Sequence, residues 1–174
     1  MLLNFGQRRI DLSTPKIMGV VNMTPDSFSD GGKIQSLSDA LKISLDMERN
    51  GAAIIDIGGE STRPGSHEVS PEIQISRVIP LIKALRESSD VIISIDTGNP
   101  EVMNAAVESG ADLINDVYAL TKEGAMQVAI DSGKIICLMH MQNLPHDMQD
   151  APSYKKLPED ILSFFEARID ACIA

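Results

Sequence analysis

The sequence predicts an α/β fold built on a parallel β-sheet, and two observations lead to that prediction. Five short apolar runs alternate along the chain with segments of helical periodicity, which is the order of repeated β/α units. The runs are nearly continuous in apolar residues, as expected for strands that are buried on both faces of a parallel sheet. Right-handed crossover connections are therefore expected between successive strands.

The elements follow in a regular order. The stretches "LLNF" and "RRIDL" flank Gly6 and Gln7, which predicts a small hairpin before the first unit. The expected strands are "KIMGVV" (16–21), "AAIIDI" (52–57), "VIISI" (91–95), "DLIN" (112–115) and "KIICLM" (134–139). The expected helices span residues 37–50, 71–87, 100–109, 121–132 and 158–173.

Several residues mark the ends of these helices. Gly51, Gly110 and Gly133 follow three of the helical segments, where glycine commonly terminates a helix. Pro71 suits the first position of the second helix. Pro80 lies inside the same helix and is expected to kink or divide it, because proline lacks the backbone N–H.

Composition restricts the class of protein. The chain has 174 residues, enough for one domain with a core, and its net charge of -10 argues against nucleic acid or an anionic membrane surface as the main partner. Cys137 and Cys172 lack the spacing of a disulfide framework or a metal site, so both are expected to be buried thiols. With no signal-peptide core and no apolar run of transmembrane length, a cytoplasmic location is expected.

Polar residues follow every expected strand. The carboxyl ends of parallel strands lie on one side of such a molecule and form the ligand crevice, so these residues are candidates for a common site. In chain order they are Asn22; Glu60, Thr62 and Arg63; Asp96 and Thr97; Asn115 and Asp116; and His140, Met141 and Gln142.

Each of these features also has a simpler explanation. Asn115 and Asp116 suit a cap for the following loop, and Asp96 suits an ordinary turn. His140 alone suits a structural histidine, and "GGES" (58–61) matches neither the dinucleotide fingerprint nor the Walker A pattern. Only the joint occurrence of polar residues at all five strand ends favours a binding site.

The residue types indicate the chemistry of that site. Asp96 and Asn115 suit a flat heterocycle, because the carboxylate accepts hydrogen bonds from an aminopyrimidine edge and the amide both donates and accepts. Thr62, Arg63 and nearby glycine amides suit phosphate oxygens. Asn22 and bound phosphate oxygens suit a shared Mg2+ ion. A heterocycle at the sheet with a diphosphate at the loops suggests displacement of pyrophosphate.

The sequence resembles the dihydropteroate synthases of folate biosynthesis. The matching motifs occur in order: "IMGVVNMTPDSFSDGG" (17–32), "DIGGESTRPG" (56–65), "ISIDT" (93–97), "INDV" (114–117) and "LMHMQ" (138–142). The resemblance implies a (β/α)8 TIM barrel, of which this chain has about five β/α units. It therefore implies a single pterin-binding barrel domain over residues 1–174 that is truncated at its C-terminus, as the amino-terminal part of a synthase.

The resemblance also implies an activity. Enzymes of this family are transferases that condense 6-hydroxymethyl-7,8-dihydropterin diphosphate with para-aminobenzoate, giving 7,8-dihydropteroate and pyrophosphate with Mg2+ as cofactor. By that likeness Asp96 and Asn115 hold the pterin ring, and Asn22 contacts the diphosphate–magnesium assembly. Thr62 and Arg63 bind near the leaving group and are the candidate catalytic residues.

The likeness further implies that Phe28 and Pro64 shape the aminobenzoate pocket, where sulfonamides compete, and that the full-length protein is a homodimer. The chain departs from the family at Asn99 and at Asn143–Leu144, and it lacks the family's later pterin- and diphosphate-binding motifs. We therefore expect no appreciable synthase activity from this piece alone, and we expect it to be poorly stable or to associate.

Two alternatives stay open on the sequence. One is a pterin- or folate-binding module of the methyltransferase type, which would use Asp96 and Asn115 without pyrophosphate chemistry. The other is an inactive truncated fragment, such as an open five-stranded doubly wound domain.

Overall fold

The structure is a computed structural model that describes residues 1–24, 36–60 and 69–173. A hairpin of β1 (Leu2–Phe5) and β2 (Arg8–Asp11) precedes the sheet, as expected. The strands of the sheet are β3 (Ile17–Asn22), β4 (Ala52–Gly58), β5 (Ile92–Asp96), β6 (Leu113–Asp116) and β7 (Ile135–Leu138). The helices that follow them are α1 (Leu37–Arg49), α2 (Pro71–Ser88), α3 (Pro100–Glu108), α4 (Ala125–Ser132) and α5 (Leu157–Ile173).

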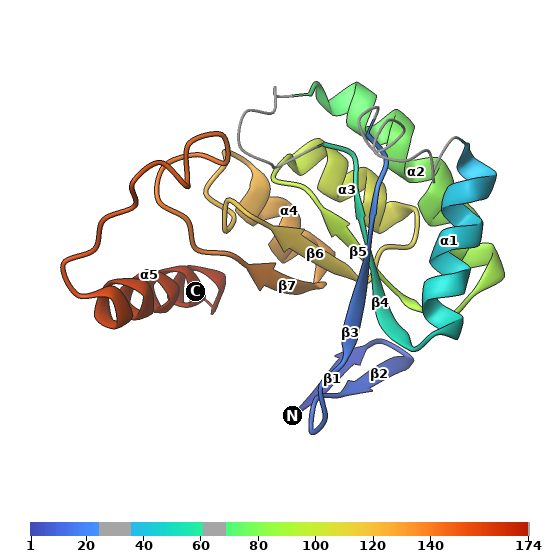
Figure 1. The fold of residues 1–174 in the computed structure, drawn as a ribbon, viewed down its shortest axis with the longest axis horizontal. Coiled ribbons are helices and arrows are strands. Elements are labelled where there is room, and N and C mark those ends of the chain that lie inside the picture. The colour runs from blue at the N-terminus through green and yellow to red at the C-terminus, as the bar shows by residue number, and fades with distance from the viewer. Residues whose placement is uncertain (25–35, 61–68, 174) are drawn as a thin grey trace.

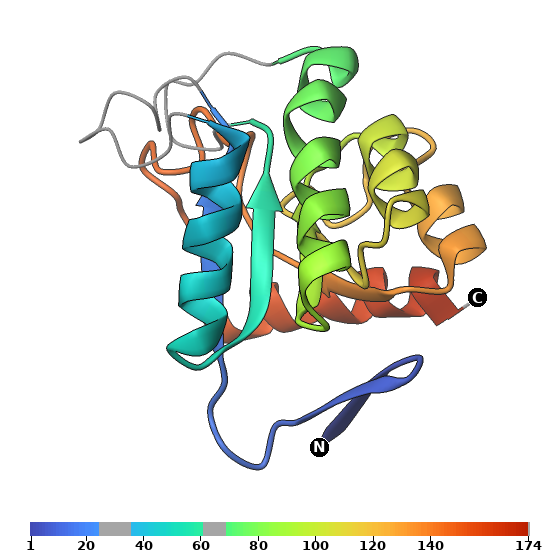
Figure 2. The same cartoon turned by 90° about the vertical axis from the view of Figure 1, so that its right-hand side faces the viewer.

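The strands pair in parallel in chain order, β3-β4-β5-β6-β7. This is the winding of a barrel, because a doubly wound sheet reverses its strand order at a switch point. Helices α1 to α4 lie side by side over one face of the sheet (Figures 1 and 2). The described residues thus form five β/α units of barrel type, and the doubly wound alternative is wrong.

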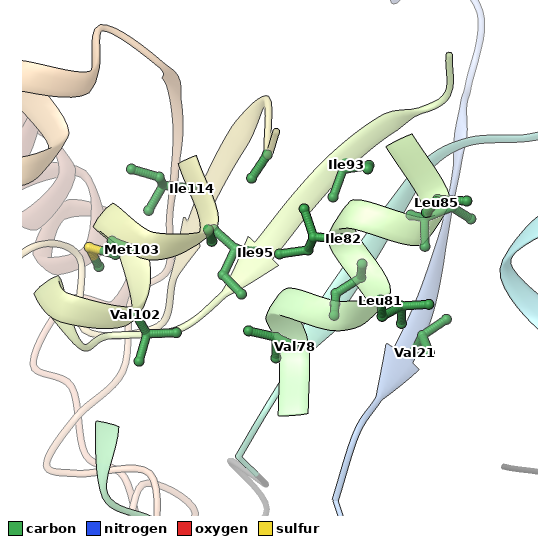
Figure 3. Packing of buried hydrophobic residues seen from close by; sticks show 14 of the residues in the cluster. Val21, Val78, Leu81, Ile82, Leu85, Ile93, Ile95, Val102, Met103 and Ile114 are labelled. Atoms are coloured by element: carbon green, nitrogen blue, oxygen red, sulfur yellow. The ribbon is translucent and has the colours of Figure 1, made fainter. Parts of the chain in front are cut away.

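The main hydrophobic core lies between the strands and these helices. Each strand contributes an apolar residue to one row across the sheet: Val21, Ile57, Ile95, Ile114 and Ile136. From α2, Val78, Leu81, Ile82 and Leu85 pack against this side of the sheet with no exposed surface (Figure 3). Because side chains alternate along a strand, the residues next to this row face the other side of the sheet.

The hairpin closes the amino end of that other, concave face. Phe5 and Ile10 are buried against Ile54, Ile92 and Leu113. The hairpin lies at the foot of the strands in Figure 1, at the end opposite to the carboxyl ends. The carboxyl ends of the strands are therefore not covered by the hairpin.

The outer strands explain one wrong prediction. In the described part of the chain β3 and β7 each have a neighbour on one side only. Cys137 on β7 is consequently exposed, and Cys172 on α5 is half-buried, so neither is the buried thiol that we expected. Burial of an apolar strand residue depends on the number of neighbouring strands, which a local pattern does not encode.

Two helices differ from their expected form. Helix α2 runs through Pro80 without division, and Pro80 lies on the exposed side of the helix. Helix α4 begins at Ala125 rather than at residue 121. The preceding segment forms turns instead, with Ala119, Leu120 and Gly124 at positive φ.

Helix α5 is joined to the rest of the molecule through few side chains. It contains no fully buried residue, and Cys172 packs at the edge of the main core. Arg168 donates hydrogen bonds to the carbonyl oxygens of Ala119 and Leu120 at 2.8 and 3.1 Å. Among the described helices, none combines the length and apolar character that crossing a bilayer requires.

Candidate functional site

The register of the sheet brings several predicted site residues together. Asn22, Gly58, Asp96, Asn115 and Cys137 occupy one row at or near the carboxyl ends of the five strands, which we call the polar row. Residues in register on parallel strands face the same side, and this side is the concave one. The structure therefore places Asn22, Asp96 and Asn115 together at the carboxyl end of the concave face, which we call the mouth.

Gly58 leaves the centre of the polar row free of a side chain. A Cβ atom built on Gly58 would lie 2.8 Å from Oδ1 of Asn22 and 3.7 Å from Oδ2 of Asp96. The Asn22 amide and the Asp96 carboxylate thus converge over a residue without a side chain. A larger residue at this position would displace the Asn22 amide.

A second acidic residue, Asp56, lies directly beneath the polar row. It is 4% exposed, two residues before Gly58 on the same face of β4, and its Oδ2 accepts a hydrogen bond from Asn115 Nδ2 at 3.1 Å. Sequence reasoning missed Asp56, although a carboxylate inside the apolar run "AAIIDI" (52–57) was a usable signal.

Several buried polar atoms in this region have no hydrogen-bond partner in the described structure. They are Asp56 Oδ1, Ser94 Oγ and Asp96 Oδ1. Buried polar groups in folded proteins are rarely left unpaired, so unpaired atoms beside an open mouth indicate a place for a ligand or for water. All three atoms are able to accept, which suits a ligand rich in N–H donors.

The electrostatics of the mouth also indicate a ligand-binding site. Burial raises the pKa of Asp96 to about 7, with smaller contributions from the negative charges of Asp56, Asp116 and Glu60. Burial also raises the pKa of Asp56, and the neighbouring side chains of Ser94 and Asn115 partly offset this rise. Carboxylates with raised pKa values in a cleft are typical of functional sites. This cluster favours a ligand that donates hydrogen bonds or carries developing positive charge.

Two other acidic residues near the mouth have structural partners. Asp116 accepts hydrogen bonds from the backbone N–H groups of Tyr118 and Leu120 at 2.8 and 2.7 Å. Glu60 accepts from the backbone N–H of Val69 at 2.7 Å and from the side chain of Gln74 at 3.2 Å. The capping explanation therefore holds for Asp116, whereas Asn115 hydrogen-bonds across the sheet to Asp56.

His140 belongs to an aromatic cluster beside α5. Its ring lies 4.8 Å from that of Phe164 in an edge-on arrangement, and the rings of Tyr154 and Phe165 are also nearby. These contacts support the structural explanation for His140 and connect the end of β7 to α5.

Four predicted site residues fall outside the described residues. They are Phe28, Thr62, Arg63 and Pro64, so the structure gives no position for the candidate catalytic pair or for the aminobenzoate pocket.

The described residues offer few ligands for a metal ion. The described ranges contain no group of three or more His, Cys, Asp or Glu residues arranged to hold a metal. Asn22 offers an amide oxygen at the mouth, beside the Asp96 carboxylate. Mg2+ commonly takes one or two protein oxygens and completes its shell with substrate phosphates and water, so the Asn22 amide oxygen fits a magnesium ion shared with a phosphate ligand.

The fold and the site together define a class of protein. Five barrel-type β/α units carry, at the carboxyl end of the sheet, the polar row and the Asp56 carboxylate beneath it, which together suit a flat heterocycle rich in N–H donors. The family described as pterin binding enzyme matches residues 18–174, and the chain belongs to that family.

Several proteins highly similar to this chain belong to one kind of enzyme within that family. The chain is 47% identical over 163 residues to a dihydropteroate synthase of Escherichia coli and 44% identical over 174 residues to that of Haemophilus influenzae. These matches cover 94% and 100% of this chain. A Yersinia pestis dihydropteroate synthase, solved as a sulfonamide drug complex, superposes with a TM-score of 0.94 at 45% identity over 99% of the chain.

The chain spans less than two thirds of these relatives. It covers 58% of the Escherichia coli protein, 63% of the Haemophilus influenzae protein and 63% of the Yersinia pestis chain. The resemblance to dihydropteroate synthases is confirmed, as is the barrel-type fold, and the relatives favour the synthase over the methyltransferase-like alternative.

Proposed function

We propose that this chain carries the pterin-binding part of a dihydropteroate synthase. The complete enzyme would condense 6-hydroxymethyl-7,8-dihydropterin diphosphate with para-aminobenzoate and release pyrophosphate. One observation carries the proposal: Asn22, Asp96 and Asn115 share one row at one mouth, beside buried acceptors that have no partner in the described structure. We further propose that residues 1–174 belong to one barrel domain.

In this proposal the ring lies against Asp96 and Asn115. The Asp96 carboxylate accepts from ring N–H groups, and the amide of Asn115 pairs with the aminopyrimidine edge. Bound N–H donors stabilise the ionised form of Asp96 and so lower its pKa from about 7. The carboxylates of Asp96 and Asp56 then favour the positive charge that develops at the pterin methylene as pyrophosphate leaves.

The leaving group would lie toward Asn22. This residue would hold a magnesium ion together with phosphate oxygens, and Thr62 and Arg63 would bind the same phosphates. When bound, the ion supplies positive charge that stabilises the departing pyrophosphate. The arylamine nitrogen attacks the methylene carbon as the C–O bond breaks, and the amine then loses a proton, so no strong protein base is required.

The second substrate would bind beside Phe28 and Pro64. A Xanthomonas albilineans dihydropteroate synthase with 4-aminobenzoic acid superposes on this chain with a TM-score of 0.88 at 42% identity, covering 98% of this chain and 60% of that one. This likeness and the Yersinia pestis sulfonamide complex support an aminobenzoate pocket in which sulfonamides compete.

We also propose a cytoplasmic location and, for the full-length enzyme, a homodimer. A reducing compartment suits the two cysteines, which form no disulfide in the described residues. The dimer is proposed from the family resemblance.

Titration calorimetry on the full-length protein tests the proposal, because this chain spans less than two thirds of its relatives. We expect 6-hydroxymethylpterin to bind, and we expect pyrophosphate with Mg2+ to bind to the pterin-loaded protein. Aminobenzoate should then bind only in the presence of both. Pterin binding that ignores pyrophosphate and aminobenzoate would favour the methyltransferase-like alternative, and absence of pterin binding would contradict the proposal.

A further inference from the structure

Asp56 is a buried carboxylate to which the family resemblance assigns no role. It lies inside β4, one strand away from β5 and two from β6, with 4% of its surface exposed. A carboxylate in such a place is costly unless it is paired, because burial disfavours the charged form. Its one described hydrogen bond is to Asn115 Nδ2, 59 residues later in the chain.

That hydrogen bond determines which end of the Asn115 amide faces the mouth. The two ends of an amide have nearly the same shape, so an unrestrained side chain exchanges its oxygen and nitrogen by rotating half a turn. An ionised carboxylate only accepts hydrogen bonds, and it therefore attracts the nitrogen end. The geometry points to Asp56 as a positioning residue that fixes the polarity of the Asn115 amide at the ring-binding mouth.

The fixed amide has a defined preference among heterocycles. With one N–H of Asn115 occupied by Asp56, the other N–H and Oδ1 are left for a ligand. A ring nitrogen next to an exocyclic amino group, the edge of a 2-aminopteridine, matches this donor and acceptor pair. A 2-oxo ring such as lumazine presents the reverse order of donor and acceptor. Asp56 thus acts, through Asn115, in selecting amino over oxo at the 2-position. This inference rests on the proposed function for the identity of the ligand.

A ligand-free experiment tests the positioning itself. Nuclear magnetic resonance of asparagine side-chain amides measures how fast the Asn115 N–H protons exchange with solvent. We expect slow exchange in the wild type and exchange at least about tenfold faster in Asp56→Ala, which removes the acceptor. Asp56→Asn, whose amide can present either end to Asn115, should also exchange faster than the wild type. Asp112→Asn is the matched control, because Asp112 is a buried carboxylate paired with Arg8 and Arg86 away from the polar row. Equal exchange in the wild type and Asp56→Ala would overturn the inference.

A binding experiment tests the consequence for selectivity. We expect Asp56→Ala to weaken 6-hydroxymethylpterin by about three- to tenfold, the usual effect of one hydrogen bond, and to reduce the preference for pterin over lumazine. The same substitution in an Asn115→Ala background should change neither quantity, because the effect passes through the amide. Equal losses in both backgrounds, or an unchanged ratio of pterin to lumazine, would contradict the inference.

The two experiments separate this inference from the proposed function. If the full-length wild-type protein fails to bind pterin, the proposed function fails, while the exchange measurement still decides whether Asp56 fixes Asn115. Circular dichroism of each variant checks that it folds, and the Asp56→Asn variant keeps the comparison informative if Asp56→Ala does not.

Discussion

At the residue scale, the mouth of the sheet combines features that oppose stability. Asp56 is a buried carboxylate and Asp96 a half-buried one, both have raised pKa values, and each has a buried oxygen without a partner among the described residues. Folded proteins usually avoid such groups in the interior. Their presence together at the carboxyl ends of the strands is the expected mark of a site shaped for a ligand instead of for packing.

Asp96→Asn should therefore stabilise the chain at neutral pH while abolishing pterin binding. The folded-state pKa of Asp96, about 7, lies above the ordinary value of 3.8, so ionised Asp96 destabilises the fold. This cost grows as the pH rises from about 4 to 7 and is complete above pH 7. We expect a gain of roughly 2 to 4 kcal/mol at pH 8 that fades toward pH 4, measured by urea unfolding. A gain that does not vary with pH would contradict the assignment of the raised pKa.

Gly58→Ala should impair the proposed leaving-group side of the mouth with little effect on folding. The new methyl group would meet Oδ1 of Asn22 at 2.8 Å and displace that amide. We expect the affinity for pyrophosphate with Mg2+ to fall about tenfold and the free energy of unfolding to change by less than about 1 kcal/mol. Asn22→Ala is the matched comparison and should reproduce the loss of affinity, which calorimetry measures. A loss confined to stability would argue against this role for Gly58.

At the scale of elements, the hairpin serves as the floor of the concave face. Phe5 and Ile10 cover Ile54, Ile92 and Leu113, so apolar strand residues below Asp56 are shielded from water. The same strands thus change character along their length, from an apolar amino end to a polar carboxyl end.

Phe5→Ala should destabilise the fold far more than a change on the exposed side of the hairpin. Truncating a buried phenylalanine costs about 3 to 5 kcal/mol, because burial is lost and a cavity is left. Leu2 lies on the same strand but is 51% exposed, so Leu2→Ala should cost less than about 0.5 kcal/mol. Urea unfolding measures both values. Similar costs for the two variants would show that the hairpin does not close the concave face.

The sequence predicted the elements well where their signals are local. Each strand is found within two residues of its predicted bounds, because continuous apolar runs mark strands that are buried on both faces. The start of α4 was misplaced because Asp116 holds Tyr118 and Leu120 in turns by side-chain hydrogen bonds that the helical pattern of residues 121–132 does not reveal.

At the scale of the whole molecule, the sheet has two open edges in the described structure. On β3, Ile17 and Val20 are 65% and 52% exposed, and on β7 Cys137 is exposed. Unpaired edges with apolar side chains are templates for pairing with another chain. The molecule therefore has the features expected of a protein that associates.

Equilibrium sedimentation should show that the 174-residue chain self-associates at micromolar concentration. Val20→Lys places a charge on the open β3 edge and should shift the distribution toward monomer. Ile73→Lys is the matched control, because Ile73 is 46% exposed on α2, away from both edges, and it should leave association unchanged. A compact wild-type monomer that unfolds cooperatively would contradict this expectation.

Part of the candidate site could be predicted from the sequence, and there is a physical reason why the rest could not. The grouping of Asn22, Asp96 and Asn115 in one row was predicted from their positions at strand ends, where parallel topology alone brings them together. Asp56 was missed because it lies inside an apolar run, and only strand parity shows that it faces the same side as Gly58. The exposure of Cys137 depends on how many strands follow β7, which is a property of the whole sheet.

Strand parity also has a consequence for how such a protein can evolve. The polar row and the row of Val21, Ile57, Ile95, Ile114 and Ile136 alternate on opposite sides of the same strands. Substitutions in the polar row can accumulate without disturbing the core between the sheet and the helices. Substitutions in the apolar row can likewise accumulate without changing the polar row. Insertion or deletion of a single residue within a strand exchanges the two sets at once, so lineages should drift by replacement and not by length change in these five segments.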